Sequence, residues 1–450
     1  MTDAAAMAKD LAATGVAGLQ ISWADNNGIP RSRVVPIDSL SEVSERGVGV
    51  TSLFAVFDSL DGITFDHEGL ANASGDVRLL PVLERVQRLA GQPALAWAPG
   101  RQVAAGGSPW PYDQRGVLER QVESAAGAGL ELRAGWEIEF VLSKADAIGV
   151  TSSPGHHGPA YSPHALLEVD DFVAALLRDA AASGLRINQL HAEYGPAQVE
   201  LSLAATDPIS AADDQLLARQ VIHAAARANG LRASFAPMVT PDGVGNGWHL
   251  HTSVWREGRN LLAGHADGPG SEGAGYVAGL LRDLPALTAI TAPSVPSTMR
   301  FRPGYFASAY QFWGVENREA PLRYVPGSQL LGEDHANVEL KPSDASANPY
   351  LALAAVFAVG AAGLFDELEL DAPIAADPGS WTVEERERRG IARLPGNAAE
   401  QDDALRACGR ISQVLGPELF GAFRAVRASD ASWAAERSAG EVVSAHLWRY

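Results

Sequence analysis

The stretch GNGWHLHTSVW, residues 245–255, predicts the fold most directly. It begins with a glycine-rich turn and then alternates apolar residues with His249 and His251, which is the pattern of a strand with one buried face. Both imidazoles therefore point to the same side. Because the chain has only 11 histidines, this pair suggests a metal-binding or catalytic strand. The alternative is a packed or half-exposed pair, which is common for an isolated H-x-H.

Carboxylates recur in other strand-like segments of the chain. In WEIEF, Glu137 and Glu139 share one face, while Trp136, Ile138 and Phe140 fill the opposite face with apolar bulk. The remaining acidic positions of this kind are Glu193 and Glu200 in HAEYGPAQVE, which also contains His191, and Glu339 in NVELKPSD. A single E-x-E segment is most often a solvated strand face. Several such segments together with H-x-H are harder to explain by solvation.

Carboxylates gathered in one concavity repel each other, so they need cations, or some of them must be protonated. Bound divalent metal resolves the repulsion. Oxygen-rich ligation with an occasional imidazole suits Mg²⁺ or Mn²⁺ better than structural Zn²⁺. The sequence therefore predicts a metal centre of that kind.

The composition narrows the class of protein. The chain has 450 residues, a formal charge of -19 and no long basic run, which argues against nucleic-acid binding. With Cys408 as the only cysteine and no basic-then-apolar start, we expect a cytoplasmic protein without a signal peptide. The apolar run at residues 349–365 begins after Asn348, a helix-start signal, and falls short of the ~20 residues of a membrane span. It predicts a buried helix.

The order of predicted elements indicates an α+β protein. GLQISWAD and SRVVPI are strand-like runs joined by NNG, which predicts a hairpin near the N-terminus. Residues 104–113, AAGGSPWPYD, are typical of a domain boundary. Beyond them, helical periodicity alternates with antiparallel-looking strands, and the last hundred or so residues are mostly helical.

Residues 299–324 carry Arg300, Arg302, Arg318 and Arg323 among aromatic residues. Guanidinium groups bind carboxylate and phosphate oxygens, so beside a metal cluster they suggest an anionic substrate and phosphoryl transfer. The alternative, which we favour for Arg302, is pairing with the excess surface acids. No P-loop or G-x-G-x-x-G turn is present, so a nucleotide would bind in another way.

In their order, WEIEF, HAEYGPAQVE, NGWHLHTS, RPGY…ENREAPLR and VELKPSDASANPYLALAA resemble the glutamine synthetases. The resemblance runs from about residue 17 to the C-terminus. It implies a small N-terminal β-grasp domain, residues 1–107, and a large catalytic domain, residues 108–450, with a curved, mainly antiparallel sheet flanked by helices. It also implies a homo-oligomer, a dodecamer of two stacked hexamers, with active sites between neighbouring subunits.

The same resemblance implies two or three Mg²⁺ or Mn²⁺ ions in each active site. The ligands on the amine side would be Glu139, Glu193 and Glu200. Those facing the nucleotide phosphates would be Glu137, His249 and Glu339.

The resemblance further implies ATP and glutamate as substrates. Phosphoryl transfer to the side-chain carboxylate of glutamate would form an acyl phosphate, which an amine then attacks. The implied glutamate contacts are Asn246, Gly247 and Arg300, and the implied nucleotide contacts are His251, Ser253 and Arg323. Arg318 and Arg323 would neutralise the phosphate, and Phe306, Arg318 and Lys341 would also belong to the substrate site. Arg300, Arg318 and an N-terminal aspartate, Asp58 or Asp61, would act in catalysis.

The sequence departs from the ammonia-using members at the amine site. Phe306 follows PGY where those members have a glutamate, and Lys341 replaces an arginine and loses its bidentate fork. A phenyl ring removes charge and adds apolar surface, so we expect an organic monoamine such as ethanolamine, bound by area burial or cation–π contact. Ammonia, a polyamine, a metal-dependent amidohydrolase activity and a non-catalytic scaffold are the alternatives.

Overall fold

The computed structural model of the protein describes residues 3–146, 149–150, 152–264 and 267–450. The strands are β1 (Gly18–Ala24), β2 (Pro30–Pro36), β3 (Val48–Thr51), β4 (Asp76–Pro81), β5 (Gln87–Arg88), β6 (Leu95–Ala104), β7 (Glu131–Lys144), β8 (Ile187–Ala192), β9 (Gln198–Leu203), β10 (Leu231–Ser234), β11 (Trp248–Arg256), β12 (Arg259–Asn260), β13 (Trp313–Val315), β14 (Leu322–Val325) and β15 (Asn337–Leu340). The α-helices are α1 (Ala4–Ala13), α2 (Leu40–Arg46), α3 (Gln114–Gly127), α4 (Pro163–Leu167), α5 (Asp170–Ala182), α6 (Pro208–Ala228), α7 (Ser271–Thr291), α8 (Pro349–Phe365), α9 (Val383–Arg388), α10 (Ala398–Ala407), α11 (Gly409–Leu415), α12 (Pro417–Ala434) and α13 (Ala439–His446). The predicted α+β class is confirmed.

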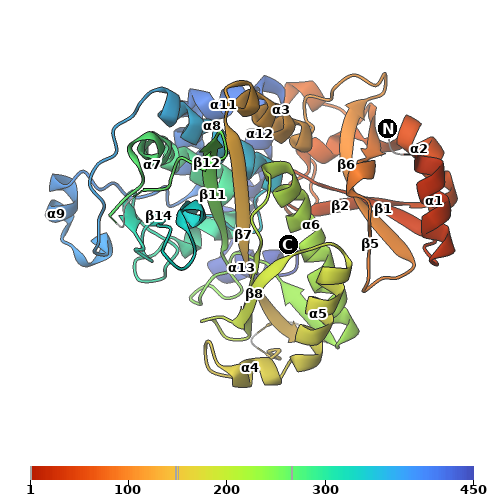
Figure 1. Cartoon of the computed structure of the whole chain (residues 1–450), viewed down its shortest axis with the longest axis horizontal. Helices are drawn as coiled ribbons and strands as arrows, with labels where there is room; N and C mark the ends of the chain where they lie inside the picture. The colour runs from red at the N-terminus through yellow and green to blue at the C-terminus, as the bar shows by residue number, and fades with distance from the viewer. Residues whose placement is uncertain (1–2, 147–148, 151, 265–266) are drawn as a thin grey trace.

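The N-terminal strands form a small domain around one sheet (Figure 1). Its strands follow the order β2-β1-β6-β4-β3, with β5 beside β6. The predicted hairpin is confirmed, because β1 and β2 pair antiparallel from Gly18 opposite Pro36 to Ala24 opposite Pro30. Leu19 and other apolar side chains of these strands make a core of their own beneath α1 and α2.

The second sheet has nine strands, and its main path is β13-β14-β15-β11-β7-β9-β8. All of its pairs are antiparallel except β13 with β14, as the sequence predicts for a mainly antiparallel sheet. On the apolar face, Trp136 of β7 stacks on Trp248 of β11 with ring centroids 4.0 Å apart. Along β7, Trp136, Ile138 and Phe140 alternate with Glu137 and Glu139, so the carboxylates lie on the side opposite the core-facing residues.

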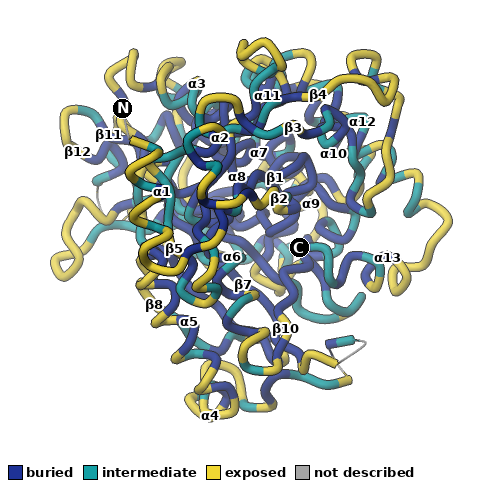
Figure 2. Tube along the Cα trace, turned by 90° about the vertical axis from the view of Figure 1, so that its right-hand side faces the viewer, coloured by how far each residue is buried: buried dark blue, intermediate teal, exposed yellow. Residues whose placement is uncertain are grey.

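Helix α8 lies in the buried interior of the molecule (Figure 2). It packs against α7 with glycines at the contact: a Cβ at Gly279 would lie 2.3 Å from the carbonyl oxygen of Val359, so a side chain there would force the helices apart. The predicted buried helix at residues 349–365 is confirmed. None of the helices in the described part of the chain is long and apolar enough to cross a membrane.

The two sheets are joined by buried polar contacts. Asn348, the N-cap of α8, donates from Nδ2 to the carbonyl oxygens of Ala24 and Asp25 at the end of β1, both at 3.0 Å. Gln114 at the start of α3 donates to Asn26 Oδ1 at 2.9 Å. Helix α6 contacts both β7 and β1, and it lies between the two sheets in Figure 1.

Candidate active site

Strand register gathers the predicted acidic and imidazole side chains on one side of the large sheet. On β11, His249 lies opposite Glu137 of β7, and His251 lies opposite Glu339 of β15. One strand further along, Glu139 of β7 lies opposite Glu200 of β9. Glu193 follows directly after β8, which pairs with β9. Side chains from separate segments of the sequence therefore meet, because the register of the paired strands turns these alternating residues to the same face of the sheet.

His249 lies at the centre of this group. Its Nδ1 is 3.3 Å from Glu137 Oε2 and 3.4 Å from Glu339 Oε1, and its Nε2 is 3.7 Å from Glu139 Oε1. All three carboxylates thus surround one imidazole. The structure brings together the three residues predicted for the nucleotide-side metal, Glu137, His249 and Glu339.

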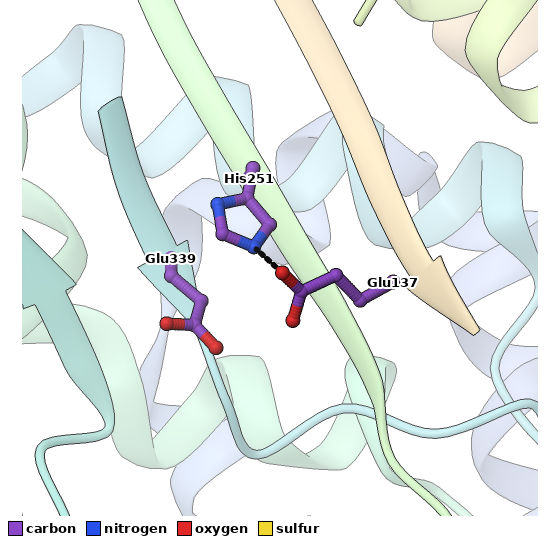
Figure 3. Close-up of side chains that lie close together, drawn as sticks. All are labelled: Glu137, His251 and Glu339. Carbon is purple, nitrogen blue, oxygen red and sulfur yellow. Dashed lines mark ion pairs between the residues drawn. The ribbon is translucent and has the colours of Figure 1, made fainter. Parts of the chain in front are cut away.

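His251 lies between Glu137 and Glu339 in Figure 3, with Nε2 3.3 Å from Glu137 Oε1. Its Nδ1 is 2.8 Å from Asn337 Oδ1. Burial alone would lower the pKa of His251, but the hydrogen bond to Glu137 and the charges of Glu339 and Glu137 raise it to about 9. These contacts favour the protonated form of His251.

Glu339 is buried and has several cationic neighbours. Lys341 Nζ donates to its Oε1 at 2.8 Å, and Arg323 Nη1 donates to its Oε2 at 2.9 Å. Burial would raise the pKa of Glu339, but Lys341, His251 and His249 hold it well below its usual range. Burial would likewise raise the pKa of Glu137, but its hydrogen bonds with His249 and His251 and their charges lower it.

The amine-side carboxylates have fewer cations beside them. Burial raises the pKa of Glu200, and the charges of Glu139 and Glu137 raise it further. His191 is the neighbouring imidazole, with Nε2 3.3 Å from Glu200 Oε1 and Nδ1 3.5 Å from Glu193 Oε2. This side of the group carries negative charge that the chain itself does not fully neutralise.

The group fits divalent cations. Potential ligand atoms lie within 4.8 Å of one another in two sets, Glu137 with His251 and Glu339, and Glu137 with Glu200 and His249. The donors are carboxylate oxygens and imidazole nitrogens, the set that suits Mg²⁺ or Mn²⁺. Burial and the charges of Glu139 and Glu137 disfavour the ionised form of Glu200, so a bound cation would stabilise that form.

Backbone and amide groups hold the turn before β11. Gly247 N donates to Glu139 Oε2 at 2.7 Å, and Gln198 Nε2 donates to Asn246 Oδ1 at 2.8 Å. Asn246 in turn donates to the carbonyl oxygen of Ala236 at 2.8 Å, so its amide is engaged in holding the turn. A Cβ at Gly247 would lie 2.6 Å from His249 Nε2 and 2.9 Å from Arg300 Nη2, so a side chain there would displace the imidazole or the guanidinium.

The predicted cationic residues lie in different surroundings. Arg300 is buried, where its Nη1 donates to the carbonyl oxygen of Ser343 at 2.8 Å and pairs with Asp344 at 3.3 Å. Arg318 is exposed, and no ion pair or hydrogen bond ties it to another residue of the described ranges. Ser253 is buried on the same strand face as His249 and His251, and its Oγ accepts from Trp255 Nε1 at 2.8 Å.

Arg302, directly before the PGYF loop at residues 303–306, departs from one expectation. Arg302 does not pair with a surface acid in the part of the chain that the structure describes; its Nη2 donates to the carbonyl oxygen of Gly243 at 2.7 Å, and its guanidinium lies 4.1 Å from the ring centroid of Tyr305. The preference for surface pairing was wrong, because the loop folds back on the turn before β11. Phe306 is 53% exposed at the tip of this loop.

Within the described part of the chain, Asp58 does not contact the acidic side chains of the large sheet. Its Oδ1 accepts from Leu60 N at 3.0 Å and from Gly62 N at 2.7 Å, and its Oδ2 accepts from Ser429 Oγ at 3.2 Å. Asp61 pairs with Arg31 at 2.7 Å and with Arg449 at 2.5 Å. Both aspartates thus hold a turn of the N-terminal domain, and no contact among the described residues links them to the acidic side chains of the large sheet.

Sequence reasoning gave no role to several residues that contact this group. Tyr161 donates from its hydroxyl to Glu193 Oε1 at 2.6 Å, and Asn337 and His191 make the contacts described above. Gln198 donates from Nε2 to Glu139 Oε2 at 3.1 Å. Gln198 could have been found, because it lies two positions before Glu200 on the same strand face. Tyr161 lies in an aperiodic loop and carries no such signal.

Comparisons with known proteins identify one family. The family model described as the glutamine synthetase catalytic domain matches residues 111–442. "Gamma-glutamylpolyamine synthetase GlnA3" of Streptomyces coelicolor is 41% identical over 450 residues, which cover 99% of this chain and 96% of that protein. A glutamine synthetase of Pyrococcus abyssi is 31% identical over 398 residues, 88% of this chain and 86% of that protein.

Solved structures share the whole architecture. A protein titled "novel glutamine synthase homolog" superposes with a TM-score of 0.85 at 29% identity, covering 97% of this chain and 99% of that one. A structure titled "GmaS/ADP complex" superposes with a TM-score of 0.82 at 26% identity, covering 97% of this chain and 98% of that one.

Proposed function

The chain belongs to the glutamine synthetase family, whose members are carbon–nitrogen ligases, and from that premise we propose that it joins the γ-carboxylate of glutamate to an organic amine at the expense of ATP. The observation that carries the proposal is the convergence of Glu137, Glu139, Glu200, His249 and Glu339 on one face of the sheet beside Arg323 and Lys341. Such a group would hold divalent cations, which concentrate positive charge where the phosphoryl oxygens need it.

The proposed metal ligands are Glu139, Glu193 and Glu200 on the amine side and Glu137, His249 and Glu339 on the nucleotide side. Mg²⁺ or Mn²⁺, two or three per site, would neutralise the phosphoryl oxygens as a Lewis acid. Hydrogen bonds from Gly247 and Gln198 keep Glu139 aimed, and Lys341 and Arg323 keep Glu339 ionised. Tight orientation of this kind is what ligands need for both affinity and selectivity.

The proposed reaction has two steps. The side-chain carboxylate of glutamate first attacks the γ-phosphorus of ATP, which gives γ-glutamyl phosphate and ADP. A neutral amine then attacks the acyl carbon, and phosphate leaves. Arg300, with Asn246 and Gly247, is proposed to hold glutamate, while His251, Ser253 and Arg323 contact the nucleotide. Arg318 and Lys341 are proposed to neutralise the transferred phosphate.

An organic amine is proposed in place of ammonia because Phe306 occupies the position of an ammonium-binding glutamate. Small hydrated ammonium needs carboxylates that replace its water, whereas an exposed phenyl ring favours a carbon skeleton. The sequence places a monoamine before a polyamine. The 41% identity to a γ-glutamylpolyamine synthetase supports a polyamine instead, and we therefore propose a polyamine ahead of a monoamine.

We also propose the division into domains at residue 107, a cytoplasmic location and a ring-forming homo-oligomer. Within the described ranges, the hydrogen bonds of the Asp58 side chain go to its own turn and to Ser429, and we propose that it acts in a site completed by a neighbouring subunit. In that arrangement its carboxylate accepts the proton that the amine loses.

The test is phosphate release that depends on ATP, glutamate and an amine, measured with ammonium, ethanolamine, butylamine and 1,4-diaminobutane in Mg²⁺ and in Mn²⁺. We expect an organic amine to give the highest kcat/KM. Ammonium exceeding every organic amine would contradict the choice of substrate. Hydrolysis of γ-glutamylamides without nucleotide, and no ATP consumption with any amine, would instead favour an amidohydrolase.

A further inference from the structure

Glu319 lies beneath the tip of the PGYF loop. Its Oε1 accepts from the backbone N–H of Phe306 at 3.4 Å, and its own carbonyl oxygen accepts from Ser308 Oγ at 3.0 Å. Phe306 and Ser308 have φ values of +52° and +67°, a region that side-chain-bearing residues seldom adopt. Residue 319 therefore fastens a loop whose backbone would not hold this shape by itself.

The same segment leads to the catalytic face of the sheet. Two residues beyond Glu319, the carbonyl oxygen of Pro321 accepts from the backbone N–H of Lys341 at 3.0 Å. Lys341 is the cation that bonds to Glu339. Glu319 thus lies between the loop that carries Phe306 and the strand that carries the phosphate-side residues.

The carboxylate of Glu319 has no cation bound to it. No salt bridge joins it to any residue in the described ranges, and the nearby Lys341 is already committed to Glu339 at 2.8 Å. Burial raises the pKa of Glu319, and the charge of Asp377 raises it further. Asp377 is brought near because Asn317 donates to the carbonyl oxygen of Ala376 at 3.1 Å. A half-buried, unpaired carboxylate with an acidic neighbour is stabilised by an added cation.

Apolar and aromatic surface lies next to this charge. Phe306 is 53% exposed, so its ring is available to a substrate that enters beside the loop; Tyr305 is 41% exposed, with the Arg302 guanidinium over its ring. Methylene groups gain from contact with such rings, and an ammonium group is attracted to their faces. The combination of ring surface and a carboxylate a short distance further on matches an alkyl chain that ends in a cation.

We propose that Glu319 determines the amine specificity by accepting the second, protonated ammonium group of a diamine or polyamine whose methylene chain lies against Phe306. Segment 317–320 thereby supplies a carboxylate that residue 306 does not. The inference rests on the glutamate–amine ligase function proposed above. It assigns Glu319 to substrate binding, in addition to its hydrogen bond with the loop.

The test compares 1,4-diaminobutane with butylamine, which share the carbon chain and differ by one charge. In the Glu319→Gln variant, an amide oxygen still accepts from Phe306 N–H while the negative charge is lost. We expect kcat/KM for 1,4-diaminobutane to fall about 10- to 100-fold, mainly through KM, and kcat/KM for butylamine to change less than about twofold. Glu316→Gln, at an exposed position three residues earlier, is the matched control and should alter neither value.

Equal losses for both amines in Glu319→Gln would show that the residue only positions the loop, and no loss with either would also overturn the proposal. If that variant does not fold, the wild-type enzyme decides: no preference for α,ω-diamines over monoamines of equal length refutes the inference. These outcomes are distinct from failure of the proposed function, in which the wild type releases no phosphate with any amine.

Discussion

The nucleotide-side group and the amine-side loop are built in opposite ways. Glu137, His249 and Glu339 lie on three paired strands, and each charge has a partner within the group. Phe306 and Glu319 lie on loops with positive-φ residues, and Glu319 has no cation among the described residues. The paired strands therefore fix the positions of the charged side chains proposed for phosphoryl transfer. The loops instead leave an unpaired carboxylate and an exposed ring that a substrate can contact. We infer that the strands carry the chemistry common to the family and that the loops carry the choice of amine.

The largest expected effect comes from a substitution in the nucleotide-side group on the strands. Glu339→Gln keeps the shape of the side chain but leaves Lys341 and Arg323 facing an uncharged amide. We expect the glutamate- and amine-dependent ATPase rate to fall about 100- to 1,000-fold, since several kcal/mol of charge stabilisation are lost. Isothermal titration should show weaker Mn²⁺ binding. Glu333→Gln, an exposed change six residues earlier, should change both values less than about twofold; equal losses in the two variants would contradict the assignment.

The next effect tests the loop side by restoring a carboxylate there. Phe306→Glu should shift the ratio of kcat/KM for ammonium to that for an organic amine by about 10- to 100-fold toward ammonium, because one charged contact is gained and apolar surface is lost. The ATP KM should stay the same, since the strand side is untouched. A ratio equal to that of the wild type would show that Phe306 does not select the amine.

Coupling between metal binding and proton release should have an effect of intermediate size on Mg²⁺ affinity. Despite burial, the hydrogen bond to Glu137 and the charges of Glu339 and Glu137 raise the pKa of His251 to about 9, so between its ordinary value and pH 9 a cation that binds these two carboxylates favours loss of the His251 proton. Mg²⁺ affinity should therefore rise with pH through this window, by at most about tenfold per pH unit, and become flat above it. Titration in two buffers of different ionisation enthalpy would measure the proton release. His251→Asn should flatten the profile; an unchanged profile would contradict the coupling.

The same imidazole should affect the stability of the metal-free protein. Its folded pKa lies above its unfolded value, so its contribution to the free energy of unfolding is full below pH 6 to 7 and is lost as the pH rises toward 9. Thermal unfolding with a chelator should show this decline, and Mg²⁺ should remove it.

The smallest effect is expected at Tyr161. Tyr161→Phe removes the hydroxyl that donates to Glu193 at 2.6 Å but keeps the ring beside His191. Because the residue is exposed, we expect only about a 3- to 10-fold loss in kcat/KM for the amine and no change in the KM for ATP. A larger effect on the KM for ATP than on the KM for the amine would contradict the assignment of Tyr161 to the amine side of the site.

Much of the site could be predicted because strands impose a period of two on their side chains. His249 and His251 had to share a face, as did Glu137 and Glu139, and Trp136 indicated which face was the core. Asn348 before Pro349 likewise predicted the start of the buried helix. The partner of each side chain could not be predicted in this way. That His251 would lie between Glu137 and Glu339, or that Arg302 would bind a backbone carbonyl, depends on which strands and loops become neighbours.

By itself, the sequence determined the alternation of apolar and charged residues along each strand, and with it the set of carboxylates and imidazoles that can face one side. Only the tertiary structure decided the register that places Glu339 beside His251, the fold-back of the PGYF loop and the position of Glu319 beneath Phe306. The physical reason is that alternation is a local property of an extended backbone, whereas the meeting of separate segments depends on hydrogen-bonded pairing and packing across the whole chain.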